Sequence, residues 1–231
     1  MIGSYLGELS REDPLHGYLQ HHIAPQLGFA SPNAGYRVFQ FADSRNVYLY
    51  EEIHGGPKLV GKFFKLSNAD QARKAGETEF NNLLFLRGLG LSARPHYVIR
   101  PYGFNPEIDN LLVLEYVAAE PLSGIINGAI HQGHRSRLFR KLSTLAHFLA
   151  ALHHRTAGEG PVQFGDSLEY MGRLLRSLTE KWGLARADGD ELYWLREAWR
   201  ARGCMWEDRA VLVHGDATPS NLLFGKGRDV I

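Results

Sequence analysis

Cysteine is almost absent from this chain. Among its 231 residues there is one, Cys204, so no disulfide can form within the chain. Small secreted domains depend on several disulfides, whereas a chain with a single thiol fits a reducing compartment. We therefore expect a cytoplasmic protein that is held together by an apolar core rather than by cross-links.

Long hydrophobic runs and an excess of charge of one sign are also missing. No apolar stretch reaches the ~18 residues that a transmembrane helix requires, and the acidic side chains among the first residues exclude a secretory signal. The 26 Lys and Arg side chains are balanced by 25 Asp and Glu, which leaves a formal charge of +1. This balance disfavours a nucleic-acid binder that relies on broad electrostatic attraction. We expect neither a membrane nor a nucleic acid as partner.

The composition is otherwise that of a globular protein, and the apolar pattern divides the chain into three parts. Residues 1–35 are predicted to form a helical N-terminal extension, because Asp13 can cap a helix that starts at Pro14. Residues 36–117 contain five short runs rich in aromatic and β-branched residues and a helical pattern at 68–87. We expect this part to be a small antiparallel sheet with one inserted helix.

The third part, residues 118–231, is predicted to be mainly helical. After a connector at 118–121, nearly all of 136–202 has a helical pattern: leucines recur at helical spacing over 138–152, and 168–182 and 190–202 are amphipathic. An apolar strand is expected at 210–213, followed by a polar loop and a second apolar segment that ends at Phe224. The sequence thus predicts an α+β fold with a small sheet-rich lobe and a larger helical lobe.

The most specific local feature lies within residues 211–224. It is the loop sequence HGDATPSN, which begins at His214 and has an apolar segment on either side. Asp216 and Asn221 are five positions apart, so a loop held at both ends can turn both side chains toward one point. A carboxylate there can accept a proton from an alcohol, and an amide oxygen can ligate a hard cation such as Mg²⁺. The alternative is a β-turn in which both side chains bond only to the backbone.

This loop resembles the catalytic loop of the aminoglycoside phosphotransferase and choline kinase family, whose members have a protein-kinase-like two-lobe fold. The resemblance implies an enzyme that transfers the γ-phosphoryl group of ATP to a hydroxyl of a small, aminoglycoside-, choline- or amino-alcohol-like molecule. It makes His214 and Asp216 the candidate catalytic residues, with Asp216 accepting the proton of the acceptor hydroxyl. It makes Asn221 a candidate ligand of Mg²⁺. ATP and Mg²⁺ are the implied cofactors.

The resemblance continues in the sheet-rich part with a lysine and a glutamate. Lys62 shares a strand face with Val60 and Phe64, so its charge needs an anionic partner or an exit to solvent. In the family a lysine at this place contacts the phosphates of ATP, and a glutamate on the next helix pairs with it. Glu79 lies on the helical stripe that points inward and is expected to be that partner. Glu77 is the alternative, although it lies about 200° around the helix from Glu79.

Further nucleotide contacts are implied at two other places. Backbone groups of Glu115 and Val117, in the segment that joins the two lobes, are expected to bind adenine. The loop at 42–46 lies where the family covers the phosphates but contains no glycine, which favours small-molecule kinases over protein kinases. We expect Ser44 in this loop to contribute turn geometry and a backbone N–H donor.

The end of the sequence departs from the family pattern. The family continues with an acidic metal ligand that follows an apolar pair, whereas Asp229 precedes such a pair. We therefore expect a truncated kinase that transfers phosphate poorly. A non-catalytic, kinase-like module that binds nucleotide or a partner is the main alternative, and an unrelated α+β protein is a third. An enzyme is favoured over these two alternatives, because the sequence contains all four of Lys62, Glu79, Asp216 and Asn221.

Overall fold

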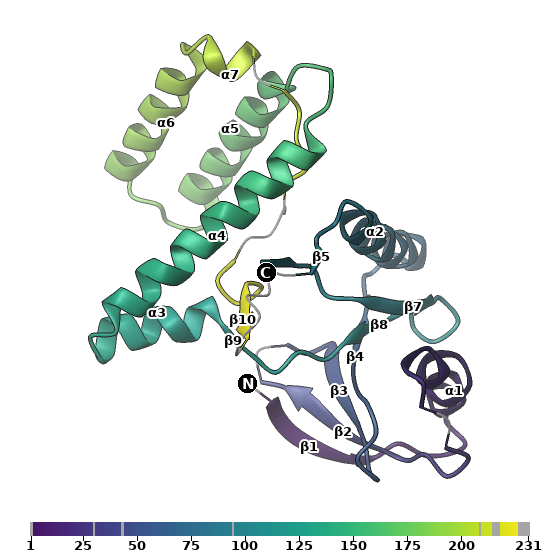
Figure 1. Cartoon of the computed structure of the whole chain (residues 1–231). Helices are drawn as coiled ribbons and strands as arrows, with labels where there is room; N and C mark the ends of the chain where they lie inside the picture. Colours follow the sequence, from purple (N-terminus) through teal and green to yellow (C-terminus); the bar gives the residue numbers. More distant parts are fainter. Residues whose placement is uncertain are drawn as a thin grey trace. The chain divides into compact units, whose positions relative to one another are not determined.

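A computed structural model shows the chain as two compact units (Figure 1). Unit 1 comprises residues 1–148 and 216–231, and unit 2 comprises residues 149–215. The predicted boundary between residues 117 and 118 falls inside unit 1. The structure describes residues 2–29, 31–42, 44–93, 95–207, 209–213 and 218–225.

Unit 1 is built on an antiparallel sheet of six strands in the order β1-β2-β3-β4-β8-β7 (Figure 1). β3 and β4 form a hairpin, because residues 53–57 connect β3 to its antiparallel neighbour β4. The prediction of an α+β fold with an antiparallel sheet is therefore confirmed, with one strand more than expected. The strands are β1 (Ile2–Glu8), β2 (Tyr36–Phe41), β3 (Val47–Glu52), β4 (Lys58–Phe63), β7 (Pro101–Asn105) and β8 (Leu111–Glu115).

The additional strand is β1, and here the prediction of a helical extension is wrong. Ile2–Glu8 pairs with β2 along the edge of the sheet. Its sequence, IGSYLGE, has neither helical nor regular alternating periodicity, so its stability comes from backbone hydrogen bonds to the sheet edge. Helical turns follow, namely α1 (Pro14–Tyr18), η1 (Leu19–Ile23) and η2 (Ala24–Leu27). Asp13 caps the first of them as predicted, since its side chain accepts a hydrogen bond from Leu15 N–H at 2.8 Å.

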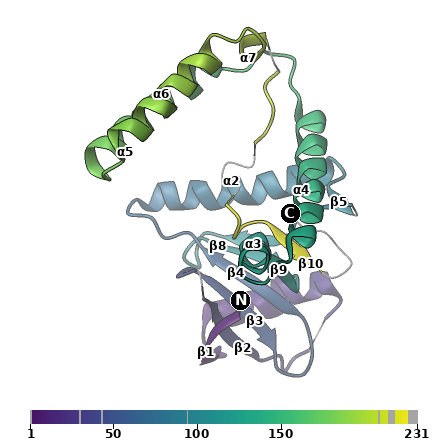
Figure 2. The same cartoon turned by 90° about the vertical axis from the view of Figure 1, so that its left-hand side faces the viewer.

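The two faces of the sheet are covered by different elements. One face packs on the turns of α1 and η1, and α2 (Ala69–Gly88) lies across the other (Figure 2). Gly76 lets α2 approach closely, because a Cβ at this position would overlap the ring of Phe104 and lie 3.1 Å from Phe64. Successive side chains of β4 point to opposite faces of the sheet. Leu59 therefore lies in the apolar core on the first face, and Lys62 lies under α2 on the second. That core contains Leu15, Leu19, Ile23, Ala34, Tyr36, Tyr50, Leu59, Leu111 and Val113.

The chain that follows β8 forms a second, smaller core in unit 1. β9 (Ala119–Pro121) pairs with β10 (Leu223–Gly225), and α3 (Leu122–His131) begins directly after β9. The predicted connector is thus in part a strand, and α3 is a helix that the sequence pattern does not indicate. A short ribbon of β5 (Ser92–Ala93) and β6 (His96–Tyr97) joins α2 to β7. The buried members of the second core are Leu122, Ile125, Leu222 and Phe224, with Leu138 and Leu145 of α4 (Arg135–Thr156) against them.

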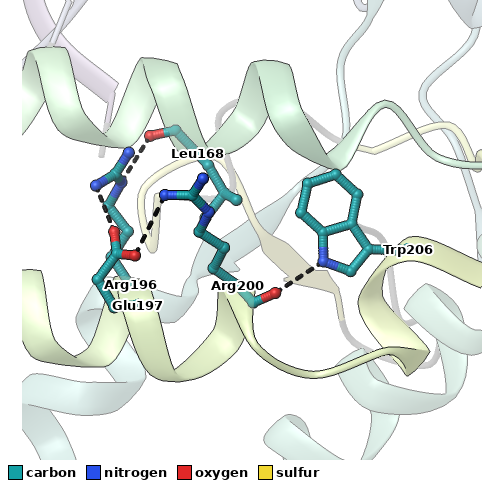
Figure 3. Close-up of polar contacts among 5 residues, drawn as sticks. All are labelled: Leu168, Arg196, Glu197, Arg200 and Trp206. Atoms are coloured by element: carbon teal, nitrogen blue, oxygen red, sulfur yellow. Dashed lines mark hydrogen bonds and ion pairs between the residues drawn. The ribbon is translucent and has the colours of Figure 1, made fainter.

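Unit 2 holds the end of α4 and three further helices, as the helical pattern predicts. These are α5 (Phe164–Lys181), α6 (Arg186–Arg200) and α7 (Cys204–Glu207). Arg196 Nε on α6 donates to the Leu168 carbonyl on α5 at 3.0 Å, and the Glu197 carboxylate accepts hydrogen bonds from Arg196 and Arg200 (Figure 3). Trp206 Nε1 donates to the Arg200 carbonyl at 2.8 Å and so ties α7 to α6 (Figure 3). No helix within the described residues has the length and apolar character that crossing a bilayer demands.

The apolar segment 210–213 is extended, but the prediction that it forms a strand is wrong. An isolated bridge joins Arg209 to Pro161, and Leu212 N–H donates to Thr156 Oγ1 at 3.0 Å. Within the described residues this bridge is isolated and does not extend into a ladder. These bonds nevertheless hold the segment against the end of α4 and the loop after it.

A buried carboxylate holds the turn between β3 and β4. Glu52 is 2% exposed, and its Oε2 accepts hydrogen bonds from the backbone N–H groups of His54 and Gly56, each at 2.8 Å. Its partner across the strands is Tyr36. Burial and, secondly, the charge of Glu52 raise the pKa of Tyr36 to about 12, so the phenol stays neutral at physiological pH.

Replacing this carboxylate should destabilise the protein. We expect Glu52→Ala to lower the free energy of unfolding by about 2–4 kcal/mol, because two charge-assisted hydrogen bonds are lost and a cavity is left. The matched control is Glu51→Ala, which removes a partly exposed ion pair with Lys58 and should cost less than ~1 kcal/mol. Urea denaturation followed by circular dichroism measures both. Equal losses in the two variants would contradict the role of Glu52.

Candidate functional site

The sheet and α2 bring Lys62 and Glu79 together, as the sequence predicts. The Lys62 ammonium lies 2.9 Å from Oε1 and 2.6 Å from Oε2 of Glu79, so it donates to both carboxylate oxygens. The ammonium also lies 5.0 Å from the centre of the Phe64 ring. The side chains of Lys62 and Glu79 are 36% and 33% exposed. One side of the ammonium is therefore accessible to a further anionic group.

Neighbouring charges have other partners, so the pairing of Lys62 is selective. The alternative carboxylate, Glu77, pairs with Arg73 one helical turn away at 3.0 Å. The next lysine along the chain, Lys65, lies 3.5 Å from Asp109 at the surface. The sequence leaves open whether Glu79 or Glu77 pairs with Lys62. The structure shows Glu79, because the two side chains leave α2 in different directions.

The loop between β2 and β3 contains Ser44. Gln40 on β2 donates through Nε2 to the carbonyls of Ser44 and Arg45, at 3.4 and 3.3 Å. Tyr48 on β3 donates its hydroxyl to the same Arg45 carbonyl at 3.0 Å. These three bonds fix the loop without a glycine in it. A hollow of about 310 Å³ lies beside the loop and is lined by Ser4, Gln40, Phe41, Ala42, Ser44 and Arg45.

The candidate adenine-binding segment starts at the end of β8. Glu115 N–H donates to the Arg100 carbonyl at 2.9 Å, so this backbone donor already has a partner. Val117 lies two residues further on, before β9, and is half-buried. The binding of a base by the backbone of these two residues stays a prediction.

Asn221 lies in a turn that the second core of unit 1 holds in place. Its N–H donates to the Thr218 carbonyl at 2.9 Å, and Ser123 N–H at the start of α3 donates to the Pro219 carbonyl at 3.1 Å. The pairing of β9 with β10 places this turn next to the chain that leaves Val117. Asn221 is exposed, so it can reach a ligand from a fixed backbone.

The two predicted catalytic residues, His214 and Asp216, lie outside the described residues, and so does Asp229. The described chain ends at Val213 on one side of the loop and resumes at Thr218 on the other. The roles of both catalytic candidates therefore stay predictions.

The structure also contains a polar cluster that sequence reasoning missed. The Tyr97 hydroxyl donates to the carboxylate of Glu115, and Arg87 Nη1 donates to the Val98 carbonyl. The guanidinium of Arg87 lies over the Tyr97 ring, 5.2 Å from its centre. The three side chains come from α2, β6 and β8, so no spacing along the chain signals their contact. We call Arg87, Tyr97 and Glu115 the β8 cluster.

Comparison with known proteins gives one family. Residues 40–231 match a family model, which is described as the phosphotransferase enzyme family. This range includes Lys62, Glu79, Glu115 and Asn221. A search of the curated proteins finds no match.

Loss of the ion pair should have little effect on stability. Both side chains are about one-third exposed, and ion pairs of this kind contribute about 0–1 kcal/mol. We expect Glu79→Gln to change the free energy of unfolding by less than about 1 kcal/mol, and Glu77→Gln to behave alike. Urea denaturation of both variants checks this. A loss above ~2 kcal/mol for Glu79→Gln alone would mean that the pair stabilises the fold rather than being available for a ligand.

Proposed function

The chain belongs to the phosphotransferase enzyme family, and we propose that it transfers the γ-phosphoryl group of ATP to a hydroxyl of a small molecule. The acceptor is a small alcohol of the aminoglycoside, choline or amino-alcohol kind, and the reaction takes place in the cytoplasm. The observation that carries the proposal is the Lys62–Glu79 pair, a cation held on an apolar strand face with one side exposed. The α+β architecture is consistent with a protein-kinase-like two-lobe fold.

The donor groups fit a magnesium-bound polyphosphate. An ammonium has three N–H donors, and Lys62 directs donors to the two oxygens of Glu79, which leaves capacity on its exposed side. The amide oxygen of Asn221 is a hard ligand of the kind that Mg²⁺ takes. A magnesium ion bound with a nucleotide is held largely by phosphate oxygens and water, together with one or two protein ligands.

Each residue then has one task in the transfer. Mg²⁺, when bound, neutralises negative charge on the phosphates. Lys62 holds a phosphate oxygen, and Glu79 fixes the ammonium in the orientation that this requires. Asp216 orients the acceptor hydroxyl and accepts its proton while the new P–O bond forms and the bond to ADP breaks; His214 belongs to the same loop. Such catalysis is mainly positioning and electrostatic stabilisation.

Nucleotide binding tests the role of Lys62. We expect the wild-type chain to bind ATP in the presence of Mg²⁺, and Lys62→Met to weaken binding about tenfold, since one charge-assisted hydrogen bond to phosphate is lost. The matched control is Lys65→Met, because Lys65 is three positions away and pairs with Asp109 at the surface. Isothermal titration calorimetry gives the affinities. Similar weakening by both substitutions would show that general charge, not the site, attracts the nucleotide.

Phosphoryl transfer tests Asp216 separately from binding. We expect Asp216→Asn to keep ATP affinity within about twofold and to lower turnover at least about 100-fold, as removal of a general base does. Release of ADP in the presence of choline, amino-alcohols and aminoglycosides is the measurement. ATP binding by the wild-type chain without turnover on any acceptor would favour a kinase-like module that binds nucleotide only. Unchanged turnover by the variant would exclude Asp216 as the base.

A further inference from the structure

We propose that the β8 cluster fixes the candidate adenine-binding end of β8 relative to α2. The base and the phosphates of one nucleotide can then be bound at the same time. The inference rests on the proposed function, because it assigns Arg87 and Tyr97 to the support of the nucleotide site. These are positioning residues: they act through the backbone of Glu115 and through α2.

Glu115 is held by both its side chain and its backbone. Its carboxylate accepts a hydrogen bond from the Tyr97 hydroxyl and one from Arg100 N–H at 3.4 Å, while its own N–H donates to the Arg100 carbonyl at 2.9 Å. Tyr97 is 7% exposed. Burial, followed by the hydrogen bond to Glu115, raises the pKa of Tyr97, so its hydroxyl remains a donor at neutral pH. The residue at the end of β8 therefore has its conformation fixed immediately before the chain turns toward Val117.

Arg87 links this arrangement to α2. It lies in the last turn of the helix, donates to the Val98 carbonyl and lies over the Tyr97 ring, a favourable cation–π interaction. Glu79 lies eight positions earlier on the same helix, or about 12 Å along its axis. α2 thus carries both Glu79, which orients Lys62, and Arg87, which supports the end of β8.

This arrangement predicts an effect that a purely structural cluster does not have. Loosening the end of β8 lowers the affinity for the base, whereas the ion pair that faces the phosphates is left in place. The base-containing ligand and the phosphate chain alone should therefore respond differently to the same substitution.

Tyr97→Phe tests the proposal, because it removes the hydroxyl and keeps the ring under Arg87. The matched control is Tyr102→Phe on β7. The charge of Glu115 also acts on the Tyr102 phenol, but within the described residues no hydrogen bond joins the Tyr102 hydroxyl to the β8 cluster, so this variant separates the hydrogen bond from mere proximity to the carboxylate. The affinities of the full chain for ATP and for inorganic tripolyphosphate, both with Mg²⁺, are measured by calorimetry. We expect Tyr97→Phe to weaken ATP binding about five- to tenfold and tripolyphosphate binding less than twofold. Tyr102→Phe should change neither by more than twofold.

Three results would overturn the proposal. Unchanged ATP affinity in Tyr97→Phe excludes the positioning role while leaving the proposed function intact. An equal loss for ATP and tripolyphosphate shows general loosening of unit 1. Absence of ATP binding by the wild-type chain overturns the proposed function and this inference together. If Tyr97→Phe does not fold, Glu115→Gln decides in its place, since its amide oxygen is a weaker acceptor and should weaken ATP binding two- to fivefold with tripolyphosphate unchanged.

Discussion

The candidate site is arranged around one ion pair, in which Glu79 fixes the direction of the Lys62 ammonium. Lys62 is about one-third exposed, so solvent screens its charge, and the carboxylate orients the ammonium more than it stabilises the fold. α2 supplies Glu79, and the pair forms because the helix can approach the sheet at Gly76. The register of β4 against β3 and β8 fixes which residues share the face with Lys62. The packing of the sheet thus determines where the cation points.

The apolar core around α1 and η1 and the candidate site lie on opposite faces of the sheet. The face toward α1 and η1 carries Tyr36, Tyr50 and Leu59 of the first core, and the buried carboxylate of Glu52 on this face accepts hydrogen bonds from turn N–H groups. The face toward α2 carries the exposed ion pair. Substitutions that alter ligand binding can therefore be made on the second face without removing the core on the first. This separation explains why a partly exposed charge pair can lie so close to a well-packed sheet.

Sequence reasoning succeeded where a residue's direction follows from local periodicity. The alternation along β4 identified Lys62, and the helical stripe of α2 identified Glu79, because both patterns are set by backbone geometry. It failed where stability is non-local. β1 depends on an edge to pair with, segment 210–213 is apolar but next to a single isolated bridge within the described residues, and α3 contains two glycines and begins without a side-chain cap. The β8 cluster joins three elements, so its contacts appear only once the chain is folded.

The proposed function assigns nucleotide binding and phosphoryl transfer to different residues. Ser44, Lys62, Glu79, Glu115 and Asn221 all belong to unit 1, so the proposed contacts to base, phosphates and metal require one folded unit. Transfer additionally requires the loop that carries Asp216. Reacting atoms in such a transfer have to lie within about 3–3.5 Å of each other, and a displacement of ~1 Å can cost about 100-fold in rate. Under the proposed function, the contacts that fix β8 and α2 are therefore expected to affect the rate as well as the affinity, since they would position the nucleotide relative to the acceptor.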